Sequence, residues 1–369
     1  MRKFFFAMCW MVAGLLAGVG MSELVLSALP VIDGHVRSED TKRWPLINYR
    51  PGTEYTYSRG WDFQTTQHGT VNNYGHLAPF DFVPGTPVVL VLGDSYIESK
   101  MNRYADTLQA QLAERYGGAV AVYGLGASGL SLADYLRLVE MASKTFDVVG
   151  VVIAMIDGDI QESMAVRAGW ARFVRDANGS WALRYVATSR PQDSRLLSWL
   201  KGRALYRYLR RNLGVTPGQF SDLFDERAPE DSAELVRPAS VSPEVLEASD
   251  YFLDHFAASA GVPPSCVAFV RDGERLSLYG VTTPRSVIDS PALVRHFTAE
   301  ARERGYSVAL LDDAFARFYA TNKARLDYWP FDRHWNRHGH GVAAAEAFHA
   351  LLGCRELAAL RFGEKHAAQ

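Results

Sequence analysis

The sequence contains little cysteine: its 369 residues include three, Cys9, Cys266 and Cys354. It has no Cys-x-x-Cys pair and no Cys/His cluster of zinc-finger spacing, which excludes the common small zinc modules. Cys9 lies in an apolar N-terminal segment, so Cys266 and Cys354 form the one possible internal pair. Two interpretations stay open for them, a disulfide formed in an oxidising compartment or two buried thiols.

An excess of charge of one sign is also missing. The formal net charge is -2 and the isoelectric point is near 6.6, so no basic field favours nucleic acid as a partner. Internal repeats and low-complexity tracts are absent. Hydrophobic residues make up 48% and charged residues 22% of the chain, which is typical of a globular protein and argues against extended disorder. The length allows one large domain or two modest ones.

A long hydrophobic run occurs at the N-terminus, where Phe4 to Met21 carries no charge. This is close to the roughly 18–20 residues that span a bilayer. A cleaved signal peptide usually has a shorter apolar core and a small-residue cleavage site, and no Ala-x-Ala precedes Ser22. We therefore expect residues 1–29 to form an uncleaved anchor, with a cleaved signal or a buried core helix as alternatives. Arg2 and Lys3 precede the run, which predicts a bacterial inner-membrane protein, single-pass, with its body in the periplasm.

The rest of the chain divides by composition. Residues 30–85 are rich in Pro, Gly, Asn and Tyr and are predicted to be an extended lead-in with short strands. Residues 86–356 alternate between apolar runs such as "TPVVLVLGDS" and segments of helical spacing, and residues 357–369 form a tail. Continuous apolar runs are typical of parallel strands buried on both faces. The alternation predicts a three-layer α/β/α sandwich with a parallel central sheet.

An insertion at residues 161–243 interrupts this alternation. It contains a predicted hairpin with Asn178-Gly179 at its turn, then the basic amphipathic segment "SRLLSWLKGRALYRYLRRNLG", expected to form one helix, and the acidic loop "DLFDERAPEDSAE". A basic amphipathic helix can lie on a membrane or face an anionic polymer, although such charges can also form a solvated face. The insertion is also the candidate lid over any site on the sheet.

Polar residues follow the apolar runs at Gly93-Asp94-Ser95, at "YGLGASG" and at Asp157-Gly158-Asp159. Ligands bind at the carboxyl ends of strands in open parallel sheets. A serine nucleophile needs a base that a carboxylate orients, and Asp332-Arg333-His334 supplies both from one loop. We therefore expect Ser95 as nucleophile, His334 as base and Asp332 as its orienting group. The backbone N–H of Ser95 and that of Gly126 are the expected oxyanion donors.

These motifs resemble those of the SGNH (GDSL-type) hydrolase superfamily from about Val71 to Leu352. "VLGDSY" corresponds to block I, "YGLGASG" to block II, and "DRHWNRHGH" to the block that carries the catalytic histidine and aspartate. The last motif and "VNNYGHLA" are similar to those of membrane-tethered and periplasmic bacterial members, including alginate acetyltransferase-like proteins. The resemblance implies a three-layer α/β/α fold, and ester hydrolysis or acyl transfer through an acyl-serine.

One block departs from the family pattern. Block III reads Gly-x-Asn-Asp in the family, and its Asn side chain donates to the oxyanion, whereas here Gly158 stands where that Asn belongs. Loss of one oxyanion donor typically lowers the rate by about 10²–10³. The backbone N–H of Gly158 is the candidate replacement, because an ionised Asp157 would repel the oxyanion.

Asp332, His334, His338 and His340 could also be read as metal ligands, since imidazole and carboxylate suit zinc. That interpretation leaves Ser95 and Gly126 unexplained, so we expect neither a metal nor a cofactor. We instead expect His340 to cap or pack against the last helix.

The sequence therefore predicts an exported serine hydrolase or acyltransferase that acts on O-acyl esters, in particular acetyl esters, of an envelope or secreted polysaccharide. Its expected partners are that polysaccharide or another O-acylated substrate, the membrane, and proteins of a polysaccharide export machine. The alternative is a catalytically weak or inactive carbohydrate-binding subunit of such a machine, which the missing Asn of block III favours.

Overall fold

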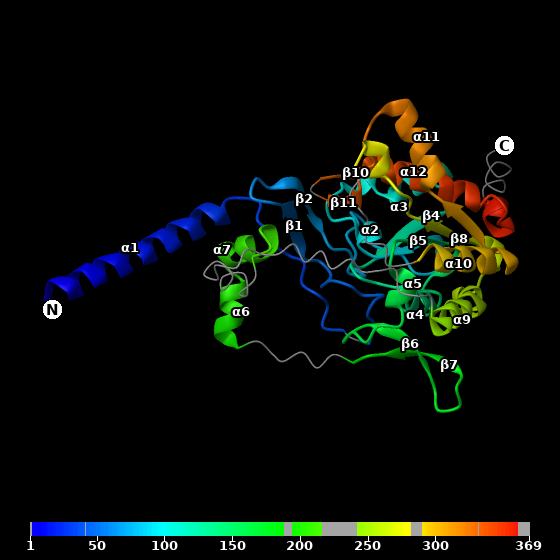
Figure 1. The fold of residues 1–369 in the computed structure, drawn as a ribbon, viewed down its shortest axis with the longest axis horizontal. Helices are drawn as coiled ribbons and strands as arrows, with labels where there is room; N and C mark the ends of the chain where they lie inside the picture. Colours follow the sequence, from blue (N-terminus) through cyan, green and yellow to red (C-terminus); the bar gives the residue numbers. More distant parts are fainter. Residues whose placement is uncertain are drawn as a thin grey trace. The chain divides into compact units, whose positions relative to one another are not determined.

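The computed structural model describes residues 2–40, 42–187, 194–215, 242–281, 290–330 and 332–360 (Figure 1). They fall into two compact units. Unit 1 comprises the described residues of 1–36, 53–70 and 190–233, and unit 2 comprises the others. The acidic loop of the insertion lies outside the described residues.

Unit 2 is built on a five-stranded parallel sheet with the strand order β4-β3-β5-β8-β9. The strands are β3 (Pro87–Gly93), β4 (Ala121–Gly126), β5 (Asp147–Met155), β8 (Val267–Arg271) and β9 (Ser307–Leu310). Residues 88–92 of β3 have no exposed surface, as expected for a central strand covered on both faces. The predicted parallel sheet is confirmed.

Helices cover both faces of this sheet, which confirms the three-layer α/β/α architecture. One layer contains α3 (Leu108–Tyr116), α11 (Asp312–Asn322) and α12 (Arg337–Ala350). The other contains α4 (Leu132–Ala142), α9 (Pro243–Ala260) and α10 (Pro291–Glu303). The sequence marks where α4 begins, because Ser131 and Asp134 form a capping box across its first turn.

Shorter elements connect these layers. They are α2 (Ser95–Glu98), α5 (Asp159–Glu162), the 3-10 turns η1 (Tyr104–Asp106), η3 (Pro264–Cys266) and η4 (Ser277–Tyr279), and the antiparallel pairs β6 (Ala171–Arg175) with β7 (Trp181–Tyr185) and β10 (Asp327–Tyr328) with β11 (Asp332–Trp335). The hairpin predicted around Asn178-Gly179 is the β6–β7 pair, and Gly179 takes a positive φ of 81° at its turn.

Cys266 and Cys354 form a disulfide, with Cα atoms 4.6 Å apart. Of the two interpretations that the sequence left open, the structure has the disulfide. It joins the start of β8 to the segment after α12, so it ties the C-terminal end of the domain to the central sheet.

Unit 1 contains α1 (Arg2–Ser27), the hairpin of β1 (Glu54–Arg59) and β2 (Gln64–Thr70), and the short helices α6 (Arg195–Lys201), α7 (Ala204–Arg207) and η2 (Tyr208–Asn212). α1 is long and apolar enough to cross a membrane, with a mean hydropathy of 2.0, and none of its residues is buried. The expectation of one continuous basic helix after Ser194 was wrong. Gly202 ends α6, and the extended backbone of Arg203 separates it from α7.

Candidate active site

Ser95 is the first residue of α2 and lies two positions after the end of β3, at the carboxyl end of this interior strand. Asp94 caps the short helix, because its Oδ1 accepts a hydrogen bond from the Tyr96 N–H at 2.9 Å. The serine side chain is half-buried, whereas Asp94 and Tyr96 are buried. The strand end therefore holds a partly exposed serine between two buried neighbours.

His334 lies on β11 and links Ser95 to a carboxylate. Its Nε2 is 2.8 Å from Ser95 Oγ, and its Nδ1 is 2.5 Å from Asp332 Oδ1. The same carboxylate oxygen accepts the His334 backbone N–H at 3.0 Å. The side chain of Asp332 is 6% exposed and that of His334 is 26% exposed. The structure thus brings together the three residues that the sequence singled out, although 239 positions separate Ser95 from His334.

This chain of hydrogen bonds defines what each group can do. With the Nδ1 proton donated to Asp332, Nε2 is the nitrogen that can accept the hydroxyl proton of Ser95. A serine, a histidine and a buried carboxylate within hydrogen-bond reach form the arrangement that activates a serine as nucleophile.

Asp94 offers Ser95 a second acceptor, since Ser95 Oγ lies 3.1 Å from Asp94 Oδ2. Burial raises the pKa of Asp94, while hydrogen bonds from neighbouring backbone N–H groups and the proximity of His334 act in the opposite direction. The hydroxyl therefore has two alternative acceptors, and only the histidine can later return the proton to a leaving group.

A buried ion network positions the histidine loop. Arg275 contacts the carboxylates of Asp272 and Asp327, the latter at 2.8 Å, and donates to the Arg333 carbonyl at 2.9 Å. Burial disfavours the charge of Arg275, but the two carboxylates outweigh it and raise the pKa, so the side chain stays cationic. The Trp335 indole donates to Asp272 at 2.8 Å. No sequence pattern marks Arg275, which lies in a loop without a recognisable motif.

Gly126 ends β4 and packs directly against the α2 turn. A Cβ atom at this position would lie 2.3 Å from the Glu98 backbone nitrogen and 2.6 Å from the Ile97 carbonyl carbon. Only glycine allows this approach. The Gly126 carbonyl accepts from Asn48 Nδ2 at 3.2 Å, so this strand end is held from a further side.

Glu98, a residue that the sequence did not single out, connects α2 to the loop after Gly126. Its side chain is 1% exposed, accepts hydrogen bonds from the Ser128 N–H (3.1 Å), the Ser128 hydroxyl and the Tyr49 hydroxyl, and pairs with Lys100 at 3.0 Å. Burial would raise its pKa, but Lys100, Arg37 and these hydrogen bonds lower the pKa to about 2. The carboxylate therefore remains charged and fixes the position of the loop.

Gly158 follows β5 and precedes α5, with a φ of 106° that side-chain-bearing residues rarely adopt. Ser95, Gly126 and Gly158 thus lie at or just after the carboxyl ends of three neighbouring strands, β3, β4 and β5. Asp157 lies 3.9 Å from Arg271, the last residue of β8, which offsets its negative charge. Asp159 is buried and accepts from the Tyr135 hydroxyl and the Ile156 N–H, both at 3.1 Å.

His340 is part of the packing, as expected. It is fully buried, its Nε2 lies 3.0 Å from Ser99 Oγ, and its Nδ1 accepts the Leu108 N–H at 3.1 Å. Burial lowers its pKa to about 3, so the ring is neutral. Because both ring nitrogens of His340 and both of His334 are engaged by protein groups, the zinc interpretation finds no support in these residues. Asn336 caps α12 through the His338 and Gly339 N–H groups.

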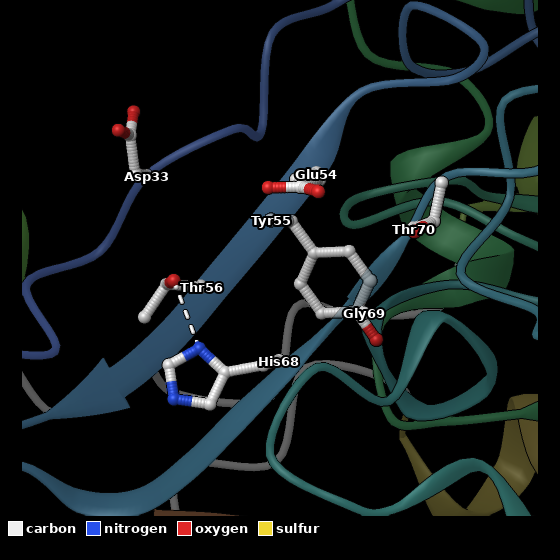
Figure 2. Close-up of a pocket in the computed structure, with 7 residues that line it drawn as sticks. All are labelled: Asp33, Glu54, Tyr55, Thr56, His68, Gly69 and Thr70. Atoms are coloured by element: carbon white, nitrogen blue, oxygen red, sulfur yellow. Dashed lines mark hydrogen bonds between the residues drawn. The ribbon is translucent and has the colours of Figure 1, made fainter.

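A separate hollow of about 470 Å³ lies on unit 1 and shares no residue with this site (Figure 2). It is lined by Asp33, Glu54, Tyr55, Thr56, His68, Gly69 and Thr70. His68 Nδ1 lies 3.0 Å from Thr56 Oγ1 across the hairpin. The hollow lacks a serine or cysteine nucleophile among these lining residues.

No family model matches the sequence, and no curated protein does. Solved structures resemble it at low identity and low TM-score. A member of the lipolytic G-D-S-L family from Veillonella parvula is 11% identical with a TM-score of 0.33, over 71% of this chain and 97% of that chain. A catalytic mutant of an acetylxylan esterase from Geobacillus stearothermophilus is 11% identical with a TM-score of 0.37, over 73% and 96%.

A protein from Slackia heliotrinireducens assigned to the SGNH hydrolases is 14% identical with a TM-score of 0.34, over 72% of this chain and 100% of that chain. The chemistry proposed below rests on distances within this chain alone.

Proposed function

We propose that the chain is an exported, membrane-anchored serine hydrolase or acyltransferase of the SGNH type, acting on O-acyl esters. The observation that carries this proposal is the continuous hydrogen-bond chain from Ser95 Oγ through His334 to Asp332. A histidine held by a carboxylate on one nitrogen and by a half-exposed serine on the other is the arrangement required to form an acyl-serine.

The reaction begins when Ser95 Oγ attacks the acyl carbonyl carbon and His334 Nε2 takes the hydroxyl proton. Asp332 stabilises the resulting imidazolium through Nδ1. The N–H groups of Ser95, Gly126 and Gly158 are the proposed donors to the oxyanion of the tetrahedral intermediate. Its collapse breaks the bond to the alcohol oxygen, and His334 returns the proton to that oxygen. Water or a sugar hydroxyl then attacks the acyl carbon of the acyl-serine, and His334 accepts its proton. Collapse of this second tetrahedral intermediate breaks the bond to Ser95 Oγ, and His334 returns the proton to Ser95.

The proposed location is the bacterial inner membrane, with the catalytic domain in the periplasm and α1 as the anchor. Two features support it: the charge-free run from Phe4 to Met21, and the Cys266–Cys354 disulfide, a bond that persists in oxidising compartments. In that location the substrates within reach are acetyl esters of envelope or secreted polysaccharides. Proteins of a polysaccharide export machine are the proposed partners.

The alternative is a catalytically weak or inactive carbohydrate-binding subunit of such a machine, and Gly158 in place of the block III Asn favours it. Against it stands the intact hydrogen-bond chain through Ser95, His334 and Asp332, since a binding module needs no activated serine.

The test uses the full-length protein in detergent with a fluorophosphonate probe, then an acetylated oligosaccharide with release and transfer of acetate measured separately. We expect labelling of Ser95 that Ser95→Ala abolishes and that Ser180→Ala, at an exposed hairpin serine, leaves unchanged. Asp332→Asn should lower kcat by roughly 10²–10⁴, because a neutral amide no longer stabilises the imidazolium and its NH₂ group can hold the histidine in the wrong tautomer. A wild-type protein that neither labels nor releases or transfers acetate would overturn the enzyme proposal and favour the binding subunit.

A further inference from the structure

The short helix α6 presents apolar side chains that nothing in the described chain covers. Leu196 is 68% exposed, Trp199 56% and Leu200 40%, and no residue of α6 is buried. Their spacing of three and four positions places these three side chains on one face of the helix. Exposure of such an apolar face to water is unfavourable, so the face indicates an apolar partner.

Cationic residues border this apolar face. Arg195 begins α6, Lys201 ends it, and the Arg203 guanidinium lies 4.8 Å from the centre of the Trp199 ring. A short helix with an aromatic and aliphatic face and flanking cations has the chemistry of an anionic lipid surface, where the apolar groups enter the headgroup boundary and the cations meet phosphates.

Glu23 joins α1 to the start of α7, the helix that follows α6 in the chain. Its carboxylate accepts hydrogen bonds from the N–H groups of Ala204 (2.9 Å) and Leu205 (2.8 Å), which begin α7. Glu23 is two residues beyond Met21, or about 3 Å further along a helix that rises ~1.5 Å per residue. The first turn of α7 is therefore bound to α1 just past the end of its charge-free run.

α6 ends only three positions before Ala204 and runs across the direction of α1 in Figure 1. If α1 crosses the bilayer, as proposed above, α6 is held beside the membrane surface from which α1 emerges. A helix lying across the spanning helix at that level has its apolar face within reach of the lipid boundary.

We propose that α6 is an interfacial membrane helix. Leu196, Trp199 and Leu200 enter the headgroup–acyl boundary beside α1, and Arg195, Lys201 and Arg203 contact anionic headgroups. This inference rests on the proposed anchoring by α1. It adds a second membrane contact that fixes unit 1 at the surface instead of leaving it attached by the spanning helix alone.

The experiment places an environment-sensitive NBD label on single cysteines of the full-length protein, reconstituted into phosphatidylcholine vesicles with or without phosphatidylglycerol. The label is attached at Leu196→Cys in a Cys9→Ala background, with the disulfide left intact. Leu352→Cys in unit 2, where the native side chain is 54% exposed, is the matched control. Native Cys9 is labelled separately to report insertion of α1.

We expect lipids carrying a shallow nitroxide to quench the label at position 196 several-fold more than at position 352, and more strongly with phosphatidylglycerol present. Arg195→Ser with Lys201→Ser should remove the phosphatidylglycerol dependence. A quenched label at Cys9 with equal, weak quenching at 196 and 352 would overturn the inference and leave the anchor intact. A blue-shifted but unquenched label at 196 would also overturn it, since a protein would then cover α6. An unquenched label at Cys9 would refute the anchor itself, and the inference with it.

Discussion

Tyr96 and Arg333 are joined by a hydrogen bond of 3.0 Å from the phenol oxygen to the backbone carbonyl. Tyr96 follows the proposed nucleophile and Arg333 precedes the proposed base, so this bond connects the two segments that must meet for catalysis. Arg275 donates to the same carbonyl at 2.9 Å. The hydrogen bonds that Tyr96 and Arg275 donate to the Arg333 carbonyl therefore help to set the distance between Ser95 and His334.

Tyr96→Phe should lower kcat on the order of 10-fold with little change in KM, because small displacements of catalytic groups are costly while substrate contacts remain. The ring, which lies 4.7 Å from that of His334, is retained. Loss of one hydrogen bond should lower the free energy of unfolding by about 1 kcal/mol. Steady-state kinetics and urea unfolding check both. Tyr319→Phe on α11 is the control, and equal effects of the two variants would contradict the positioning role.

Arg275→Met should destabilise the protein more severely, because it leaves the buried carboxylates of Asp272 and Asp327 without their cation. Removal of one partner from a buried ion network typically costs about 3–5 kcal/mol. Arg275→Lys keeps the charge but cannot reach both carboxylates and the Arg333 carbonyl together, so it should fold and still lose activity. An Arg275→Lys variant with wild-type kcat would show that activity does not require one side chain to contact both carboxylates and the Arg333 carbonyl.

The sequence was informative where a motif is local. Ser95, Gly126 and the Asp332–His334 pair each lie in a short segment with a distinctive pattern, and continuous apolar runs predicted the strands that carry them. Arg275 and Glu98 could not be found in this way, because the groups that explain them come from distant positions: Asp327 is 52 residues from Arg275, and Asn48 is 50 residues from Glu98.

Two further features depended on geometry that a sequence pattern does not contain. The Cys266–Cys354 bond spans 88 positions, and only the packing of the C-terminal segment against β8 brings the two Cα atoms within bonding range. The apolar residues after Ser194 keep helical spacing on both sides of Gly202, so the pattern predicts one helix. In the structure the chain breaks at Gly202 into two helices, because one glycine can end a helix without disturbing the spacing.

Gly126→Ala should abolish most activity, because the new methyl group would meet the backbone of α2 at 2.3 Å and displace Ser95. Overpacking of this kind typically costs about 1–3 kcal/mol of stability. Gly124→Ala is a matched control on the same strand, since its methyl group would meet the Gln109 side chain at 2.8 Å, and a side chain can move. Similar losses of kcat in the two variants would contradict a specific role for the approach of Gly126 to α2.

Gly158→Ala should lower stability by about 1–2 kcal/mol, since a Cβ atom is disfavoured at positive φ. If the Gly158 N–H donates to the oxyanion, kcat should fall as well. Gly179→Ala at the hairpin turn is the control, because it introduces a Cβ atom at a positive φ of 81° and should lower stability without lowering kcat. Gly158→Asn should not raise kcat, because a side-chain-bearing residue is strained at a φ of 106°. A clear gain of activity in Gly158→Asn would contradict this explanation of the block III departure.

Glu98 should make the stability of the protein depend on pH. Its pKa is about 2 in the folded chain and 4.5 in the unfolded one, so the folded state binds the proton less readily. The ionised form therefore contributes about 3 kcal/mol of stability above pH 4.5, and this contribution is lost as the pH falls toward 2.

Glu98→Gln should remove that part of the pH dependence. We expect the free energies of unfolding of wild type and variant to differ most near pH 7 and to converge as the pH approaches 2, measured by urea unfolding at each pH. Glu140→Gln on α4 removes an exposed carboxylate that pairs with Lys144, just past the end of the helix, and it should shift the curve by no more than about 0.5 kcal/mol. Parallel curves for Glu98→Gln and wild type would show that the contacts of Glu98 with Lys100, Ser128 and Tyr49 do not lower the pKa of this buried carboxylate.

Glu98→Gln should also lower kcat at pH 7 while the fold stays intact. The reason is that the loop after Gly126 loses the ionised acceptor that fixes it beside Ser95.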